Sequence, residues 1–179
     1  MKPASQKYIF YIYSKNRAIS SPDLPSGYQL KIWKPSVPEL NPRGLPKFPF
    51  ILWSMMHYLK LFKNTNYRIF LVYYENKIAH YSVVLPKHFK YPFMDDNDIQ
   101  IGPVGTDVKH RRKGLASYTV GKIIETYKNT ECKFWYLTRD GNIPSKAFIE
   151  SLGFSRHGEG FRGSGPGIGI LGRFYLKNK

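Results

Sequence analysis

The sequence predicts one α+β domain, and three observations indicate this class. Two apolar segments, 67–74 and 78–85, flank a short polar turn at 75–77, as in a β-hairpin. A third apolar segment, 99–104, leads through a basic loop into a helical pattern at 116–127. With 179 residues, the chain is long enough for a single hydrophobic core.

The N-terminal part is expected to supply two strands and one helix. Residues 8–13 and 28–33 are rich in tyrosine and isoleucine and are separated by a turn containing proline and glycine. The prolines between Pro35 and Pro49 exclude a helix there and indicate a long surface excursion. Residues 51–62 then predict a helix, which is shorter than the roughly 20 residues needed to cross a bilayer.

The central strands and the C-terminal end complete the expected sheet. His80, inside the segment 78–85, is expected to be a hydrogen-bonded strand histidine, with a position facing a substrate as the alternative. Residues 154–161 and 168–176 are expected to form two closing strands joined by a glycine-rich turn. A phosphate-binding loop is the other interpretation of these glycines, but no Gly-Lys-Ser/Thr follows them.

The segment from Ile99 to Tyr127 has the features of an anion site. Apolar residues recur there at helical spacing, namely Ala116, Val120, Ile123, Ile124 and Tyr127. The first turn of a helix has N–H groups without partners and the positive end of the helix dipole. Gly114 leaves room for an anion beside the backbone, and residues 109–113 are all basic or histidine. A diphosphate is the predicted ligand, and a solvated basic turn is the alternative.

Two motifs flank the expected strand at 133–138. Arg111-x-x-Gly114-x-Ala116 resembles the Gln/Arg-x-x-Gly-x-Gly/Ala signature of the GNAT superfamily of acyl-CoA-dependent N-acyltransferases. Asn142-Ile-Pro-Ser145 followed by Leu-Gly-Phe at 152–154 resembles the second motif of that family. The resemblance covers residues 67–161 of a single domain, 1–179. It implies an α/β/α-layered fold with a mixed, mostly antiparallel sheet, whose fourth and fifth strands splay and whose faces are flanked by helices.

The same resemblance implies acetyl-CoA as cosubstrate, with its pantetheine arm in the gap between the splayed strands. Main-chain groups of one strand would bind the pantetheine, and amides of the basic loop and first helical turn would bind the pyrophosphate. Two side chains of the second motif would lie near the end of the pantetheine. These implied cofactor-binding residues are Val104, Gly105 and Thr106; Arg111, Arg112, Lys113, Gly114, Leu115, Ala116 and Ser117; and Asn142 and Ser145.

The catalytic residues depart from the family pattern. Many members use a tyrosine four residues before the glycine of Gly-Phe as the acid for the CoA thiolate, but this chain has Ile149 there. We expect another hydroxyl, Tyr136 or Ser145, to donate the proton; water, or a domain that has lost catalysis, are the alternatives. In some members a carboxylate at the start of the fourth strand acts as the general base, and the corresponding residue in this chain is Asp98. A solvated strand-opening aspartate is the alternative for Asp98.

Composition bears on the partners. The 28 Lys and Arg residues against 12 Asp and Glu residues give a net charge of +16, which favours anionic ligands. Short patterns at 78–81, 101–103 and 169–175 resemble GNAT proteins of bacterial surface-polysaccharide gene clusters and imply an amino sugar as acceptor, including a nucleotide-linked one. A second anion site is then expected from five residues: Lys87, His88, Lys90, Arg156 and Arg162. The alternative is an acetyltransferase acting on tRNA or a ribosomal protein, or a basic nucleic-acid-binding module.

Other features limit the possibilities. One cysteine, Cys132, excludes an internal disulfide, and no spacing of ligand-type residues predicts a metal site. The chain has no long apolar run and no signal-peptide pattern, so a cytoplasmic location without a membrane span is expected. The oligomeric state is left open, with a dimer as a plausible assembly.

Overall fold

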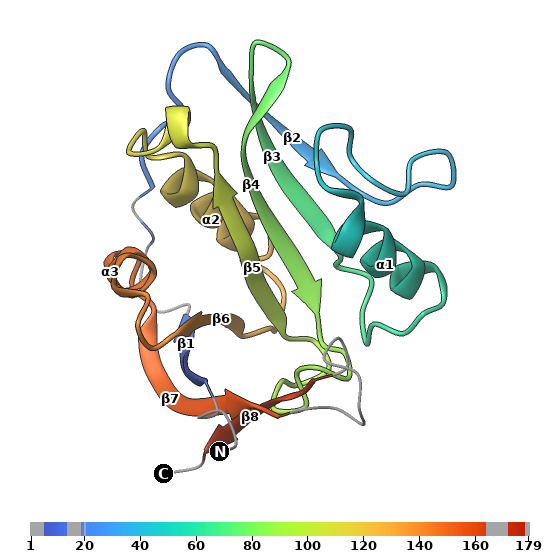
Figure 1. Ribbon diagram of the computed structural model, residues 1–179, viewed down its shortest axis with the longest axis vertical. Coiled ribbons are helices and arrows are strands. Elements are labelled where there is room, and N and C mark those ends of the chain that lie inside the picture. The colour runs from blue at the N-terminus through green and yellow to red at the C-terminus, as the bar shows by residue number, and fades with distance from the viewer. Residues whose placement is uncertain (1–5, 14–18, 20, 164–171, 178–179) are drawn as a thin grey trace.

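A computed structural model describes residues 6–13, 19, 21–163 and 172–177 of the protein. Within these residues, eight strands form one sheet in the order β2-β3-β4-β5-β6-β1-β7-β8 (Figure 1). Only β5 and β6 pair in parallel; the other neighbouring strands are antiparallel. The strands are β1 (Lys7–Tyr13), β2 (Tyr28–Trp33), β3 (Arg68–Tyr74), β4 (Lys77–Pro86), β5 (Ile99–Thr106), β6 (Phe134–Arg139), β7 (Ser155–Arg162) and β8 (Phe174–Lys177). The predicted α+β class with a mixed, mostly antiparallel sheet is confirmed.

Helices cover both faces of the sheet. Helices α2 (Leu115–Thr126) and α3 (Ile143–Ser151) bury Val120, Ile123 and Ile149 in one core against β5 and β6. Helix α1 (Lys47–Tyr58) and the loop from residue 87 to 98 contribute to a second core that includes Trp135 of β6. Because side chains alternate along a strand, β1, β3, β4 and β6 each supply residues to both cores, whereas the apolar residues of β5 pack in the first core.

The two N-terminal strands are not neighbours in the sheet. Strand β1 lies between β6 and β7, with Ile9 opposite both Thr138 and Glu159, whereas β2 forms the far edge beside β3. The connection between β1 and β2 passes along α2, where a side-chain carbon at Gly121 would lie 2.5 Å from Ser21 Cβ. Glycine at this position therefore allows the close approach of the two segments.

The structure shifts several predicted boundaries. Helix α1 is assigned from Lys47, before the predicted start, but its backbone is non-helical at Phe48, with a φ of −98° and a ψ of 134° directly before Pro49. It ends at Tyr58 instead of residue 62. The hairpin at 67–85 is confirmed, with positive φ angles of 47° and 61° at Glu75 and Asn76 in its turn.

The C-terminal strands pair as expected, although β8 begins at Phe174. Most of the predicted glycine-rich turn and the start of the predicted last strand, 164–171, lie outside the described residues. No helix in the part of the chain that the structure describes is long and apolar enough to cross a membrane.

Candidate active site

Strands β5 and β6 separate after a short parallel contact. They pair at three positions, Ile99–Phe134, Gln100–Trp135 and Ile101–Tyr136. The register between β4 and β5 then shifts at Gly102, which has a φ of 131° that favours glycine. Beyond this point β5 continues along β4, and β6 continues along β1. The predicted splay of these two strands is therefore present.

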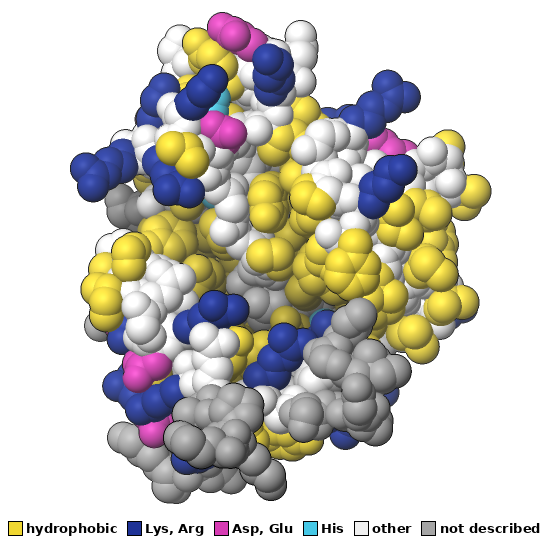
Figure 2. All heavy atoms as spheres, in the orientation of Figure 1, with side chains coloured by type: hydrophobic (Ala, Val, Ile, Leu, Met, Phe, Trp, Pro, Cys, Tyr) yellow, Lys and Arg dark blue, Asp and Glu magenta, His cyan; other side chains and the backbone are white. Residues whose placement is uncertain are grey.

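A cleft of about 540 Å³ fills the gap between the separated strands. On the side of α2 and α3 it is lined by Ala116, Tyr136 and Ser145. On the α1 side it is lined by Tyr8 and Leu137, which pack with the second core, and by Gln100, whose side chain alternates with those of Ile99 and Ile101. Figure 2 shows a hollow in this face, lined mainly by hydrophobic side chains and rimmed by Lys and Arg. The cleft thus gives access through the sheet.

The cleft brings together residues from four elements that the sequence places far apart. Five of the predicted site residues line it: Val104, Ala116, Tyr136, Asn142 and Ser145. Gly105 and Thr106 line a different cavity, of about 330 Å³, between β4 and the connector at 44–46. The side chain of Asn142 also caps α3 by accepting from the Ser145 amide at 3.2 Å.

The basic loop has the geometry of an anion site. Arg112 and Gly114 adopt left-handed conformations, with φ angles of 59° and 74°, and Gly114 is the N-cap of α2. No described side chain caps this helix, so the amides of its first turn are available to a ligand. The side chains of Arg111, Arg112 and Lys113 are exposed beside it. Leu115 instead is buried, in a small core with Val72 and Ala79.

A buried polar network fixes the position of this helix end. His80 of β4 contacts Thr106 Oγ1 of β5 through Nδ1 at 2.7 Å. Its Nε2 contacts Ser82 Oγ at 2.9 Å and Thr119 Oγ1 of α2 at 2.8 Å. The Thr119 hydroxyl also lies within 3.1 Å of the Leu115 and Ala116 carbonyls of the first turn. The network therefore ties α2 to β4 and to β5, and β5 borders the cleft.

Burial lowers the pKa of His80 to about 4, so the imidazole is neutral at physiological pH. His80, Ser82 and Thr119 are fully buried. The structure thus agrees with the expectation of a hydrogen-bonded strand histidine. A second contact holds the loop from outside the network: Tyr28 Oη lies 2.8 Å from His110 Nδ1.

Tyr136 borders the cleft with its hydroxyl hydrogen-bonded to Ser145. Its hydroxyl lies 2.8 Å from Ser145 Oγ at the edge of the cleft, and only 8% of the residue is exposed. Burial raises the pKa of Tyr136, and the hydrogen bond with Ser145 opposes this only in part, so the phenol keeps its proton at neutral pH. Ile149, at the position of the usual acid, is fully buried and packs in the core beneath α3.

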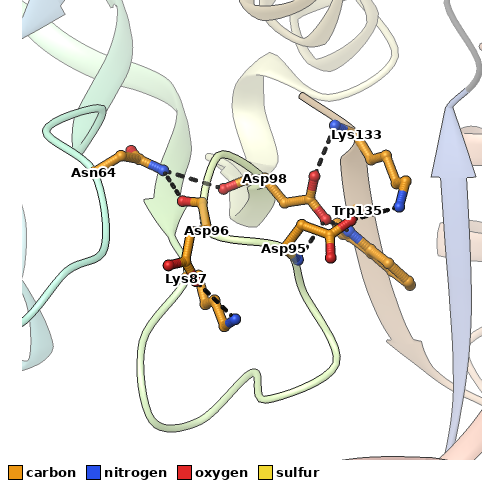
Figure 3. A network of polar contacts seen from close by, with 7 residues as sticks. All are labelled: Asn64, Lys87, Asp95, Asp96, Asp98, Lys133 and Trp135. Carbon is orange, nitrogen blue, oxygen red and sulfur yellow. Dashed lines mark hydrogen bonds and ion pairs between the residues drawn. The ribbon is translucent and has the colours of Figure 1, made fainter. Parts of the chain in front are cut away.

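The carboxylate of Asp98 is held by hydrogen bonds to neighbouring N–H groups and does not have the environment expected of a catalytic base. Figure 3 shows its carboxylate between the turn at residue 95 and strand β6. Oδ1 accepts from the Lys133 amide at 2.9 Å, and Oδ2 accepts from the Asp95 amide at 2.9 Å and from Trp135 Nε1 at 2.7 Å. Asp98 is 2% exposed and lines neither cavity described above. A carboxylate with three N–H donors and no access to the cleft is not placed to deprotonate a substrate.

The expected second anion site does not contain all five predicted residues. Lys87 forms an ion pair with Asp96 at 2.9 Å (Figure 3), and Arg156 forms one with Glu159 at 2.9 Å. Arg156 also lines a separate cavity against α3. His88 is buried and donates from Nδ1 to the Pro86 carbonyl at 3.0 Å, and burial lowers its pKa to about 4. These three residues therefore do not form one site.

Lys90 and Arg162 remain together. Lys90 is partly buried, and its pKa is lowered first by burial and then by the charge of Arg162. The Arg162 guanidinium lies 5.8 Å from the centre of the Phe174 ring, which in turn contacts Tyr8 of the cleft with ring centres 5.0 Å apart. Two cations near the α1 side of the cleft favour an anion there.

Gln100 was missed by the sequence prediction. It lines the cleft, is 5% exposed, and its Nε2 donates to the Ile101 carbonyl at 3.1 Å. Its Oε1 is buried without a hydrogen-bond partner among the described residues. The only signal in the sequence was a polar residue between two isoleucines of an apolar strand. In the described part of the chain, no group of three or more His, Cys, Asp or Glu side chains could hold a metal ion.

A splayed sheet, a cleft through it and an uncapped helix end at its border define the fold of an acyl-CoA-dependent acyltransferase. The model of the acetyltransferase (GNAT) family matches residues 32–154. The chain therefore belongs to the GNAT family, whose members use acetyl-CoA as cosubstrate.

Solved structures agree with this fold. A tandem GNAT protein from the clavulanic acid biosynthesis pathway is 15% identical, with a TM-score of 0.57 over 86% of this chain and 51% of that one. A GNAT-family protein from Novosphingobium aromaticivorans is 17% identical, with a TM-score of 0.59 over 88% of this chain and 62% of that one. The chain thus spans about half to three fifths of the length of these structures. No curated protein matches it in sequence.

Proposed function

We propose that the protein transfers the acetyl group of acetyl-CoA to the primary amine of an anionic amino sugar, including a nucleotide-linked one. The observation that carries the transfer reaction is the cleft through the sheet. Its α2 side offers free helix amides and positive charge for the pyrophosphate, and its α1 side is open to a second substrate. The two substrates would meet at the point where β5 leaves β6.

The reaction follows from the groups at that point. The neutral amine attacks the thioester carbonyl, the carbon–sulfur bond breaks, and the sulfur receives a proton from the Tyr136 hydroxyl, which Ser145 orients at 2.8 Å. The proton lost by the amine passes to water. Asn142 and the main chain of Val104 line the cleft and would position the pantetheine arm.

Two observations support an anionic acceptor, and a third supports a sugar. The net charge of +16 produces a field that concentrates anions and repels cations. Lys90 and Arg162 lie near Tyr8 on the α1 side, separate from the basic loop at 111–113. The short patterns shared with GNAT proteins of surface-polysaccharide clusters favour a sugar, and we assign the protein to polysaccharide synthesis on that ground.

Thiol release from acetyl-CoA would be measured against a panel of nucleoside-diphosphate amino sugars, free amino sugars, aminoacylated tRNA, spermidine and an aminoglycoside. We expect the highest kcat/KM for a sugar nucleotide and a decrease as salt screens the contacts. Efficient acetylation of either polycation, with no activity on any sugar nucleotide, would overturn the acceptor assignment but not the transfer reaction. Preference for the tRNA would favour the nucleic-acid alternative.

A matched pair of variants tests the anion site. Lys90→Ala should raise the KM for the sugar nucleotide about tenfold, as expected for the loss of one charge-assisted contact. Lys87→Ala removes an equal charge that is already paired with Asp96 and should change KM less than twofold. Equal effects of the two variants would show that only the overall charge of the protein matters.

A further inference from the structure

Gln100 is a buried side chain that lines the cleft and has one hydrogen-bonding atom without a partner among the described residues. Its Nε2 donates to the Ile101 carbonyl at 3.1 Å, which identifies the other end of the amide as the oxygen. That oxygen, Oε1, is buried and has no partner among the described residues. Buried polar atoms are nearly always paired in folded proteins, so an unpaired one in a cleft indicates a ligand group.

The backbone holds this amide where the strands separate. Gln100 is paired with Trp135 in the last stretch before β5 leaves β6. A side-chain carbon at Gly102 would lie 3.1 Å from Gln100 Nε2, so the absence of a side chain at Gly102 gives the amide its space. The Gln100 amide is therefore fixed at the opening of the splay.

Gln100 and Tyr136 face the cleft from opposite sides of the sheet. Tyr136 is paired with Ile101, and both pack in the core beneath α2 and α3. Gln100 alternates with Ile101 and so lies on the α1 side, next to Trp135 of the second core. A proton donor thus borders the cleft on the cofactor side, and a free hydrogen-bond acceptor borders it on the other.

We propose that Gln100 Oε1 accepts a hydrogen bond from an N–H of the acceptor amine and thereby orients its lone pair toward the thioester. This inference rests on the proposed acetyl transfer. An amide does not take up the proton, so Gln100 is a positioning residue and not a general base, and the proton leaves to water.

Gln100→Met removes the oxygen and keeps the length of the side chain. We expect the KM for the amino acceptor to rise about tenfold, while the dissociation constant of acetyl-CoA changes less than twofold. Gln29→Met, on the exposed edge strand β2, is the matched control and should change neither value. Acetyl-CoA binding by calorimetry also reports that the cleft of each variant is intact.

A second readout depends on the hydrogen bond itself. The amino acceptor and its analogue with hydrogen in place of the amino group would be compared as ligands of both proteins. The wild type should prefer the amino compound about tenfold more strongly than Gln100→Met does. Gln100→Glu places a carboxylate there, whose pKa burial raises, and should add a new acidic limb to the pH profile of kcat/KM.

Three results would overturn the inference. If the dissociation constant of acetyl-CoA rises in Gln100→Met by the same factor as the KM for the acceptor, Gln100 contacts the pantetheine. Unchanged acceptor KM in Gln100→Met, or an unchanged preference for the amino compound, would remove it from the acceptor site. Failure of the wild type to release thiol with any amine, despite binding acetyl-CoA, would contradict the proposed function instead.

Discussion

The two sides of the cleft are built in different ways. On the α2 and α3 side, the groups that we propose to bind acetyl-CoA come from two continuous segments, 104–117 and 142–145, each shaped by its own glycine or helix cap. On the α1 side, Tyr8, Gln100 and Leu137 come from three separate strands and share no motif. In our proposal, cofactor recognition is therefore encoded locally, whereas acceptor recognition arises only when distant strands pair.

The largest expected effect concerns the cofactor side. Ala116→Glu directs a carboxylate into the cleft beside the free amides of α2 and should reduce acetyl-CoA binding below detection in calorimetry. Gly114 is a poorer site for this test. Its φ of 74° disfavours other residues, and an added Cβ would lie 3.0 Å from Pro22 Cγ, so a substitution there would strain the backbone.

Thr126→Glu adds the same charge near the other end of the same helix and should leave binding within twofold of the wild type. If Ala116→Glu still binds acetyl-CoA normally while circular dichroism shows an intact fold, the pyrophosphate does not lie at this helix end.

The second effect compares a histidine on each side of the sheet. Burial lowers the pKa of both His80 and His88 to about 4, below the roughly 6.5 of an unfolded chain. The unfolded state therefore binds more protons between these values, and stability present above pH 6.5 is lost as the pH falls toward 4. Each histidine should contribute about 3 kcal/mol to this loss.

Denaturant unfolding at several pH values would measure this loss of stability at low pH. The free energy of unfolding should fall less steeply between pH 6.5 and 4.5 in His88→Gln than in the wild type. The difference in slope should correspond to about one proton fewer taken up on unfolding. His88→Gln should cost less stability at pH 7 than His80→Gln, because His88 has one unpartnered ring nitrogen and His80 has none. A decrease in stability that is equally steep in His88→Gln and the wild type would contradict the lowered pKa.

The third effect tests the chemistry between the two sides. Tyr136→Phe should lower kcat about 100-fold with little change in KM, because a proton donor to the thiolate acts mainly in the transition state. Since burial raises the pKa of Tyr136, any loss of kcat from its ionisation should set in at a higher pH than for an ordinary tyrosine.

Tyr11→Phe is the control: its hydroxyl donates to Glu150 Oε1 at 2.7 Å and lines a separate cavity. An unchanged kcat in Tyr136→Phe would make water the proton donor.

The difference between the two sides explains what the sequence could predict. The basic loop, the capping role of Asn142 and the buried face of α2 depend on neighbours within a few residues, so their patterns are visible in the chain. The place of β1 between β6 and β7 depends on partners more than a hundred residues away, and no local pattern specifies such pairing. Tyr8 enters the cleft for that reason alone.

Asp98 shows the same limit at a single position. Counting along the strand reached the neighbourhood of the proposed acceptor site, because Asp98 and Gln100 are two residues apart and lie on the same side. The count did not reveal that the Lys133 and Asp95 amides donate hydrogen bonds to the carboxylate oxygens of Asp98. It also did not reveal that Gln100, the next residue on this side, lines the cleft. These contacts depend on the fold of the loop before β5.

The smallest expected effect tests how β4 and β5 hold helix α2 in place. Thr119→Val keeps the shape of the side chain but removes the hydroxyl that joins His80 to the first turn of α2. Acetyl-CoA contacts both β5 and α2 in our proposal, so a small shift between them should weaken its binding about tenfold. 3′,5′-ADP alone should bind Thr119→Val and the wild type equally, because it needs only the helix end and the basic loop. Thr126→Val removes a similar hydroxyl, bonded to the Lys122 carbonyl at 2.7 Å, without touching a strand, and should bind acetyl-CoA normally. Equal losses for acetyl-CoA and for 3′,5′-ADP in Thr119→Val would instead mean that the helix end itself has been distorted.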